Sequence, residues 1–216
     1  DSLSLLETMK DQDFLKSNGF SNKTALGMYI PNSYDIKWND SAKGFRDKML
    51  REYHRFWNSN RISKADALNL SKDEVMTLAS IVQKETAKVD ERPRVAGVYM
   101  NRLKRGMPLQ ADPTVIFAIK EKANDFDKVI KRVLYKDLEI DSPYNTYKYA
   151  GLPPGLIAMP DISSIDAVLN YEKHNYIYFV VNVDKFGYHK FAKTLTQHNR
   201  NKQEYVRWIN KKGINR

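Results

Sequence analysis

The chain has 216 residues, of which 42% are hydrophobic and 12% aromatic, a composition typical of a globular domain rather than a disordered segment. It carries 36 basic and 26 acidic residues, and the net charge of +10 favours an anionic partner such as nucleic acid, an acidic membrane face or an acidic polymer. There is no cysteine, which excludes thiol catalysis, disulfides and cysteine-ligated zinc. No apolar run approaches the roughly 18 residues of a membrane span.

In the N-terminal half, the spacing of apolar residues predicts helices over residues 2–16 and 41–60, separated by a turn-rich segment that contains glycine, proline and aromatic residues. A stronger helix start follows. Ser71 can cap a helix and Glu74 stands three residues later, so the two complete a capping box just before an apolar run. This helix is expected over residues 72–88.

The remaining elements are expected in the following order: a helix over 92–104, a loop with a short extended run over 107–117, a helix over 122–138, an irregular segment over 141–160, a helix over 163–172, strands over 175–183 and 188–194, and a closing helix over 196–212. No repeat, low-complexity tract or clear linker interrupts the chain. We therefore predict one α+β domain with a helical N-terminal half that carries the helix of Glu85. The C-terminal half should contain a small antiparallel sheet and the closing helix.

Glu85 is the residue of this helix that ordinary packing does not explain. On a helical wheel it falls at the edge of the apolar stripe, so we expect it to be half buried at the rim of the core. A carboxylate in such a place needs a partner or a task. One hypothesis is an ion pair with a nearby arginine: Arg92, Arg94 or Arg102. The other is a general acid, whose pKa partial burial raises toward neutrality.

Two loops combine amide, hydroxyl and carboxylate groups with aromatic rings. The side chains concerned are Gln110, Asp112, Tyr144, Asn145, Thr146 and Tyr147. This combination suits a sugar-binding cleft, where polar groups bind hydroxyls and aromatic rings cover the C–H faces of the sugar. The alternative is that these loops cap the core and that their polar side chains bond their own backbone.

Other chemistries have less support. The four histidines lack metal-ligand spacing and no phosphate-binding glycine loop or GxSxG motif occurs, so neither a metal nor a cofactor is expected. His189 and His198 are interpreted as structural histidines or as members of one polar cluster. Basic residues alternate with aromatic ones over 51–57 and 204–212, which would suit nucleic-acid binding, but ordinary amphipathic helices share this pattern.

Five blocks of the sequence together resemble the endolytic peptidoglycan (murein) transglycosylases of the MltG, or YceG-like, family. The blocks are LASIVQKET (78–86), AGVYMNRLKRGMPLQADPTVIFA (96–118), SPYNTYKYAGLPPGLIAMP (142–160), YIYFV (176–180) and YHKFAKTLTQHN (188–199). They follow the order of the family from about residue 25 to 206. The family pattern LEGxxxPDTY is only partly kept, as ALGMYIPNSY, with Leu26 and Asn32 in place of its two carboxylates.

The resemblance implies that Glu85 is the catalytic acid and base, and that Gln110, Asp112 and residues 144–147 border the substrate. It implies cleavage of the β-1,4 bond between MurNAc and GlcNAc within nascent glycan strands, which leaves 1,6-anhydro-MurNAc ends and terminates strand elongation without metal or cofactor. Two alternatives from other classes are a non-catalytic peptidoglycan-binding module and a basic nucleic-acid-binding protein.

The resemblance also implies where the protein works. Family members usually carry an N-terminal membrane helix, so we expect a single-pass protein of the cell membrane with its catalytic domain on the extracytoplasmic side. Residues 1–24 are expected to be the remnant of an upstream region, and residues 25–216 the YceG-like catalytic domain. The expected partners are peptidoglycan glycan strands and cell-wall synthases, and not nucleic acid.

Overall fold

The computed structural model describes residues 1–130 and 132–211, and it confirms the predicted α+β class. Its helices are α1 (Ser2–Met9), α2 (Gln12–Ser17), η1 (Ala25–Met28), α3 (Ala42–Phe56), α4 (Ser59–Ala67), α5 (Lys72–Glu85), α6 (Arg92–Lys104), α7 (Asp112–Ala123), η2 (Tyr135–Glu139), α8 (Ile162–Leu169) and α9 (Leu195–Lys211). Strands β1 (Tyr178–Val181) and β2 (His189–Ala192) pair antiparallel, with Tyr178 opposite Ala192 and Val181 opposite His189.

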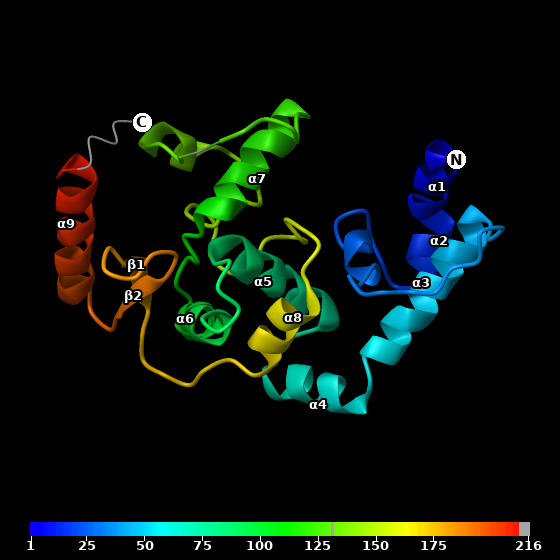
Figure 1. Cartoon of the computed structure of the whole chain (residues 1–216), viewed down its shortest axis with the longest axis horizontal. Coiled ribbons are helices and arrows are strands. Elements are labelled where there is room, and N and C mark those ends of the chain that lie inside the picture. The colour runs from blue at the N-terminus through cyan, green and yellow to red at the C-terminus, as the bar shows by residue number, and fades with distance from the viewer. Residues whose placement is uncertain (131, 212–216) are drawn as a thin grey trace.

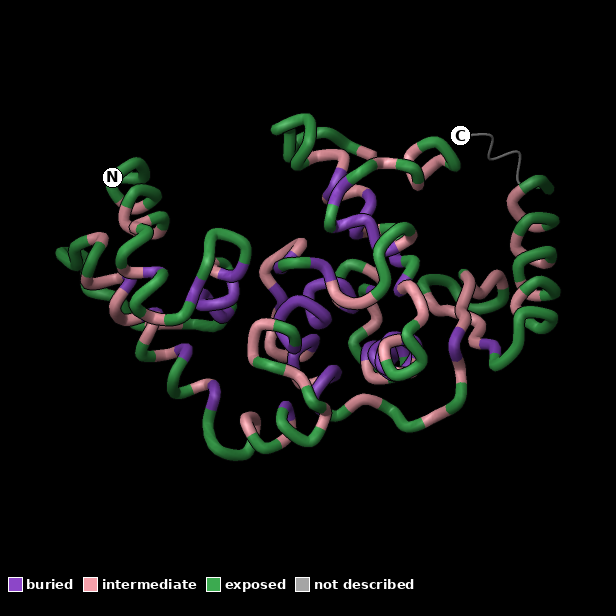
Figure 2. The backbone as a smooth tube through the Cα atoms, turned by 180° about the vertical axis from the view of Figure 1, so that it is seen from behind, coloured by how far each residue is buried: buried purple, intermediate pink, exposed green. Residues whose placement is uncertain are grey.

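The elements form an elongated molecule with α5, α6 and α8 at its centre (Figure 1). Helices α1 to α3 make up one end, and α4 leads from them back to the centre. The sheet and α9 make up the opposite end, while α7 extends from the central helices. Buried backbone is concentrated in the central helices and the first half of α7, whereas α1 and α9 are mostly exposed (Figure 2). The core therefore lies around α5.

Helix α5 begins at the predicted capping box. The Ser71 hydroxyl accepts the backbone N–H of Glu74, and the Glu74 carboxylate accepts the backbone N–H of Ser71. Every residue from Val75 to Val82 is buried, because α8, α6 and α7 pack around the helix. Each large apolar side chain buried in this way contributes about 1.5–3 kcal/mol. The helix ends at Glu85, just beyond the enclosed stretch.

The segment between η2 and α8 has no regular structure, as predicted, and side chains of α5 hold its second half. The Gln83 amide donates to the carbonyl oxygen of Met159 at 3.1 Å and accepts the backbone N–H of Asp161 at 2.5 Å. The Ser80 hydroxyl accepts the backbone N–H of Ile157 at 3.1 Å. These bonds satisfy backbone groups that have no helix or sheet partner.

The prediction was wrong for the region of α7. The predicted loop over residues 107–117 contains the start of α7, where Pro113 occupies the first turn, a position that suits proline. The predicted helix over 122–138 is also wrong for the residues described. Asn124 ends α7 in the left-handed conformation, with φ of 49°, and the chain continues irregularly to η2. Residue 131 lies outside the described residues.

Two predicted helices are interrupted by caps. The helix expected over residues 2–16 is split into α1 and α2, because Asp11 caps α2 by accepting the N–H of Phe14 at 3.1 Å. The helix expected over 41–60 ends at Phe56, and Asn58 then caps α4. The remaining helices, the two strands and the closing helix are confirmed to within three residues at each end, with residue 212 outside the described part of the chain.

Gly97 marks the point where α6 crosses the segment that follows α8. A Cβ atom at this position would overlap the carbonyl oxygen of Glu172 and lie 2.6 Å from His174 Nε2. The segment is tied to the start of α6, since the Glu172 N–H donates to the Pro93 carbonyl at 2.9 Å. Glycine is therefore required here by close packing of two backbones.

We expect Gly97→Ala to lower the free energy of unfolding by about 1–3 kcal/mol, because the added methyl group forces the two segments apart. Gly44→Ala is the matched control within α3, since its Cβ would meet only the Ser41 hydroxyl at 3.4 Å. Helix propensity alone should make this control more stable by up to about 1 kcal/mol. Urea denaturation followed by circular dichroism measures both, and equal stability of the two variants would contradict the close packing at Gly97.

Candidate active site

Glu85 is the last residue of α5 and lies where the core meets solvent. The residue is half buried, as predicted, and its Oε2 atom is enclosed beside the Tyr99 hydroxyl. The carbonyl end of a helix carries partial negative charge, which disfavours an ionised carboxylate there. Burial and the position at the end of the helix therefore both disfavour the ionised form of this carboxyl group.

The three arginines considered as ion-pair partners are engaged elsewhere. Arg92 pairs with Asp161 at 2.8 Å, and Arg94 pairs with a glutamate after α8 at 2.9 Å. Arg102 donates its guanidinium hydrogens to backbone carbonyl oxygens of the segments before β1 and α7. Among residues 1–130 and 132–211, Glu85 forms no ion pair. The structure therefore contradicts the hypothesis of an ion pair between Glu85 and one of these arginines.

The pKa of Glu85 is raised to about 7. Burial is the main cause, since desolvation penalises the charged form. The positive charge of His189 opposes this effect, the negative charge of Asp112 adds to it, and Tyr99 and Arg102 oppose it more weakly. A carboxyl with this pKa is protonated in a large fraction of molecules at neutral pH, which is what a general acid requires.

Tyr99 is a member of the site that the sequence prediction missed. Its ring is 1% exposed, and its buried hydroxyl lies against the Glu85 carboxyl. Burial, followed by the neighbouring Glu85 carboxyl, raises the pKa of Tyr99 well above its ordinary value, so the hydroxyl keeps its proton. The available signal was its spacing of three residues from Arg102, which places both side chains on one face of α6.

Asp112, Tyr147 and Gln110 are the predicted binding residues that reach the surface of the site. Asp112, at the start of α7, accepts the Tyr147 hydroxyl at 2.5 Å, and both groups interact with the charge of Glu85. The Gln110 side chain accepts a hydrogen bond from Arg102 at 3.2 Å. The backbone of Gln110 has φ of 51°, a conformation uncommon outside glycine and frequent at functional sites. The structure therefore brings Asp112 and Tyr147 close to Glu85, while Gln110 binds Arg102.

The other three predicted binding residues face the core. Tyr144, Asn145 and Thr146 are 2%, 0% and 1% exposed. The Asn145 amide donates to two backbone carbonyl oxygens in and after η2, both at 2.8 Å, and the Thr146 hydroxyl accepts the N–H of Ala111 at 3.1 Å. These contacts match the alternative in which polar side chains of the loops bond the loops' own backbone.

The other functions considered from the sequence would require exposed aromatic rings, grouped metal ligands or a long apolar helix. Tyr53 and Trp57, two of the three aromatic residues of the basic stretch 51–57, are 5% and 3% exposed, so these two are not available to stack on bases, and Phe56 is half buried. Within the described ranges no three histidine or acidic side chains are grouped as metal ligands would be. No helix in that part of the chain is both long and apolar enough for a bilayer. The two histidines considered as one polar cluster have different partners. His198 stacks on Tyr178, whereas His189 contacts the Glu91 carboxylate at 2.8 Å.

The chain belongs to the YceG-like family, whose model matches residues 3–204. The endolytic murein transglycosylase of Bacillus subtilis (strain 168) is 44% identical over 189 residues, which cover 86% of this chain and 49% of that protein. The protein of the same name from Streptococcus pneumoniae serotype 2 (strain D39) is 34% identical over 180 residues, which cover 83% of this chain and 32% of that protein.

The fold is shared with a solved structure of a yceG-like protein from Listeria monocytogenes, with a TM-score of 0.76 and 33% identity. That match covers 93% of this chain and 67% of the other. The resemblance found in the sequence is therefore confirmed at the level of family and fold. The chain spans about half, or less, of the length of the two curated relatives.

We expect Glu85→Gln to stabilise the protein at alkaline pH only. A carboxyl whose pKa rises from 4.5 to about 7 on folding binds its proton more tightly in the folded state. The wild type therefore loses up to about 3 kcal/mol as pH rises through this range, and the amide variant does not. Urea denaturation at about pH 5 and pH 8 measures the difference.

Glu121→Gln, an exposed residue of α7, is the control and should leave the pH dependence of stability unchanged. If the wild type and Glu85→Gln showed the same change in stability between the two pH values, the raised pKa of Glu85 would be refuted.

Proposed function

We propose that this chain is the catalytic portion of an endolytic murein transglycosylase, which cleaves the β-1,4 bond between MurNAc and GlcNAc within nascent peptidoglycan strands. The observation that carries the proposal is the carboxyl of Glu85, which is half buried, lacks an ion-pair partner in the described residues and has a pKa of about 7. The names of the Bacillus and Streptococcus relatives support the substrate class.

The first chemical step needs an acid. Protonated Glu85 donates its proton to the glycosidic oxygen, which leaves with GlcNAc as its bond to C1 of MurNAc breaks. Positive charge then develops at C1 and the ring oxygen. Asp112 is exposed beside Glu85 and supplies a negative charge that can stabilise it.

The second step needs a base. The carboxylate left on Glu85 takes the proton of the MurNAc 6-hydroxyl while O6 bonds to C1, which regenerates the acid and closes a 1,6-anhydro ring. No water is consumed, so one carboxyl is sufficient, whereas most glycoside hydrolases use two. A hydroxyl held close to C1 competes with water because its effective molarity can be on the order of 10⁵ M or more. Strand elongation ends at the cut.

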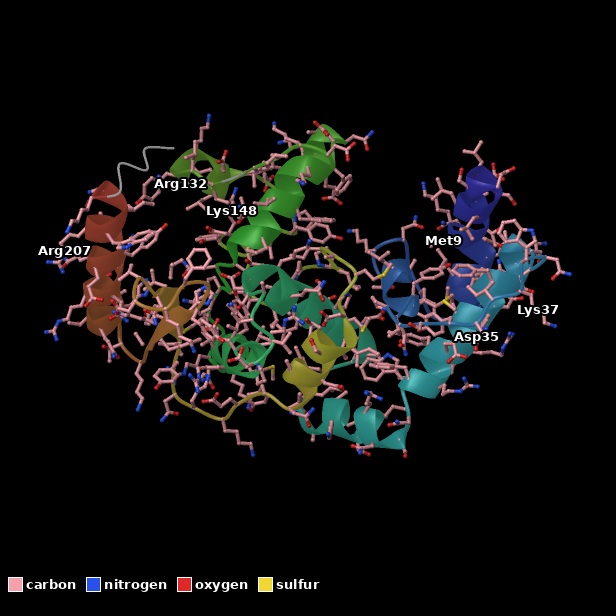
Figure 3. The ribbon with its side chains drawn as sticks, in the orientation of Figure 1. Met9, Asp35, Lys37, Arg132, Lys148 and Arg207 are labelled. Atoms are coloured by element: carbon pink, nitrogen blue, oxygen red, sulfur yellow. The ribbon has the colours of Figure 1, made fainter. Side chains whose placement is uncertain are left out.

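The surface charge suits this substrate. Peptidoglycan strands carry lactyl-linked peptides with free carboxylates, and the chain has a net charge of +10. Exposed basic side chains are present on two separate parts of the molecule, with Arg132 and Lys148 near α7 and Arg207 on α9 (Figure 3). Cations distributed in this way raise the local concentration of an anionic polymer.

The proposal extends to location and domain organisation. We place residues 25–216 in a catalytic domain on the extracytoplasmic side of the cell membrane, tethered by a single-pass segment upstream of residues 1–24, and cell-wall synthases are the proposed partners. The support is the substrate class named for the relatives, since murein strands are assembled on that side of the membrane.

Digestion of purified, peptide-bearing glycan strands tests the reaction. We expect products from cuts within strands whose new MurNAc ends are 1,6-anhydro sugars, lighter by one water than hydrolysed ends, as measured by mass spectrometry. Glu85→Gln should keep the fold and glycan binding but lose turnover by about 100-fold or more, because an amide cannot transfer the proton.

Each alternative has a distinct outcome. A Glu85→Gln variant that keeps more than about a tenth of the activity would remove Glu85 from the mechanism. Reducing MurNAc ends as the main product would mean that water is the nucleophile, with Asp112 the first candidate for its activation. Binding of glycan without cleavage by the wild type would identify a binding module, and retention of DNA in place of glycan a nucleic-acid-binding protein.

Two loop variants should separate binding from folding. Gln110→Ala should reduce glycan cleavage several-fold with little change in melting temperature, because Gln110 is exposed beside the site. Asn145→Ala should lower stability by about 1–3 kcal/mol, because two buried carbonyl groups lose their donor. Its folded fraction should keep normal specific activity.

Gln203→Ala, an exposed position on α9, is the control for both measurements. A normal melting temperature combined with lost activity in Asn145→Ala would instead assign Asn145 to substrate binding.

A further inference from the structure

Glu91 and His189 form a buried pair that joins three parts of the chain. Glu91 directly precedes α6 and His189 begins β2, and their side chains are 4% and 12% exposed. The Glu91 carboxylate accepts the backbone N–H of His189 at 2.7 Å and contacts its Nδ1 atom at 2.8 Å. It also accepts the hydroxyl of Thr86, the residue after Glu85, at 3.1 Å. Buried ionisable groups this close require each other as partners.

These contacts determine the state of the imidazole. Burial alone would raise the pKa of Glu91, but the hydrogen bonds from His189 and Thr86 outweigh it and lower the pKa, so Glu91 is ionised at neutral pH. A carboxylate only accepts, hence His189 Nδ1 carries a proton and Nε2 decides the charge of the ring. Phe179 packs edge-on against the imidazole at 5.0 Å, which restricts the orientation of the ring.

Two routes connect this pair to the reacting carboxyl. Along the chain, Thr86 follows Glu85 and binds the Glu91 carboxylate. Through packing, Phe179 contacts both the His189 ring at 5.0 Å and the Tyr99 ring at 5.9 Å. Tyr99 is in turn the buried neighbour of Glu85. Among the neighbouring charges, that of His189 has the largest effect on Glu85.

We propose that His189, oriented by Glu91, is a positioning residue whose imidazolium stabilises the carboxylate that Glu85 bears between proton donation and proton return. This inference rests on the proposed function and deepens it. Without the cation, the carboxylate would stand in a desolvated position at the negative end of α5, where the protonated form is favoured. Glu85 would then be too weak an acid to give up its proton at the same rate.

Several other charged or titratable groups lie near Glu85 and His189. Glu85 faces Tyr99 and Arg102 on α6, Asp112 on α7 and Tyr147 in the loop before α8. Near His189, besides Glu91, lie Asp90, hydrogen-bonded to Tyr188 at 3.0 Å, and Lys88, positioned over the Tyr188 ring. Arg102 donates hydrogen bonds to backbone carbonyl groups, which hold it in place. Substitution of His189 therefore removes one positive charge and leaves Arg102 where it is.

The titration of Glu85 in protein labelled with ¹³C at the glutamate carboxyl carbon tests the inference without any substrate. The NMR signal is assigned by its absence in Glu85→Gln. In His189→Gln we expect the midpoint of Glu85 to move to higher pH, because the stabilising cation is gone. Glu91→Gln should move it in the same direction, since the imidazole loses the carboxylate that orients it. The double variant should move it no further than His189→Gln alone.

His54→Gln, an exposed histidine of α3, is the control and should leave the midpoint unchanged. On glycan strands, His189→Gln should lower kcat by about tenfold with little effect on KM. The high-pH limb of kcat should move up together with the Glu85 midpoint. A purely structural role for His189 would change the melting temperature but not this limb.

The titration distinguishes a failure of this inference from a failure of the proposed function. An unchanged Glu85 midpoint in folded His189→Gln and folded Glu91→Gln would overturn the inference, and if the first variant does not fold, the second decides. A shifted midpoint in a protein that leaves glycan intact would uphold the coupling of His189 to Glu85 and overturn the proposed reaction instead.

Discussion

The burial of α5 is the constraint on which the rest of the structure depends. The helix is enclosed from Val75 to Val82 by three other helices, and it ends at Glu85, where the enclosure opens to solvent. The exclusion of water stabilises the apolar side chains of α5. It also makes a negative charge at the end of this helix costly. The same packing that holds the domain together therefore raises the pKa of Glu85 to about 7.

Side chains bond the backbone of the loops around this carboxyl and hold them in place. Gln83 bonds the backbone on both sides of Pro160, and Arg92 pairs with Asp161 at the start of α8. On the other side, Asn145 holds the loop that carries Tyr147. Rigid support of this kind positions surface groups with the accuracy that catalysis demands.

The site is maintained at a cost to stability. Burial of the Glu85 carboxyl against the Tyr99 hydroxyl disfavours its ionised form, which lowers stability as pH rises. Charges of both signs surround the carboxyl, with Arg102 and His189 opposing Asp112. This balance suits the proposed role of Glu85, in which the carboxyl has both protonation states during one reaction, and the surrounding core supplies the stability that the site gives up.

The sequence by itself determined the elements and properties that depend on local patterns. The position of Glu85 at the rim of a capped, apolar helix followed from spacing along that helix, and the family followed from short motifs. The tertiary structure alone decided that Gln110 faces solvent while Asn145 faces the core, because side-chain direction in an irregular loop is set by distant contacts and not by periodicity. It also brought Glu91 against His189 across 98 residues of sequence, a contact that only the packing of β2 on the start of α6 creates.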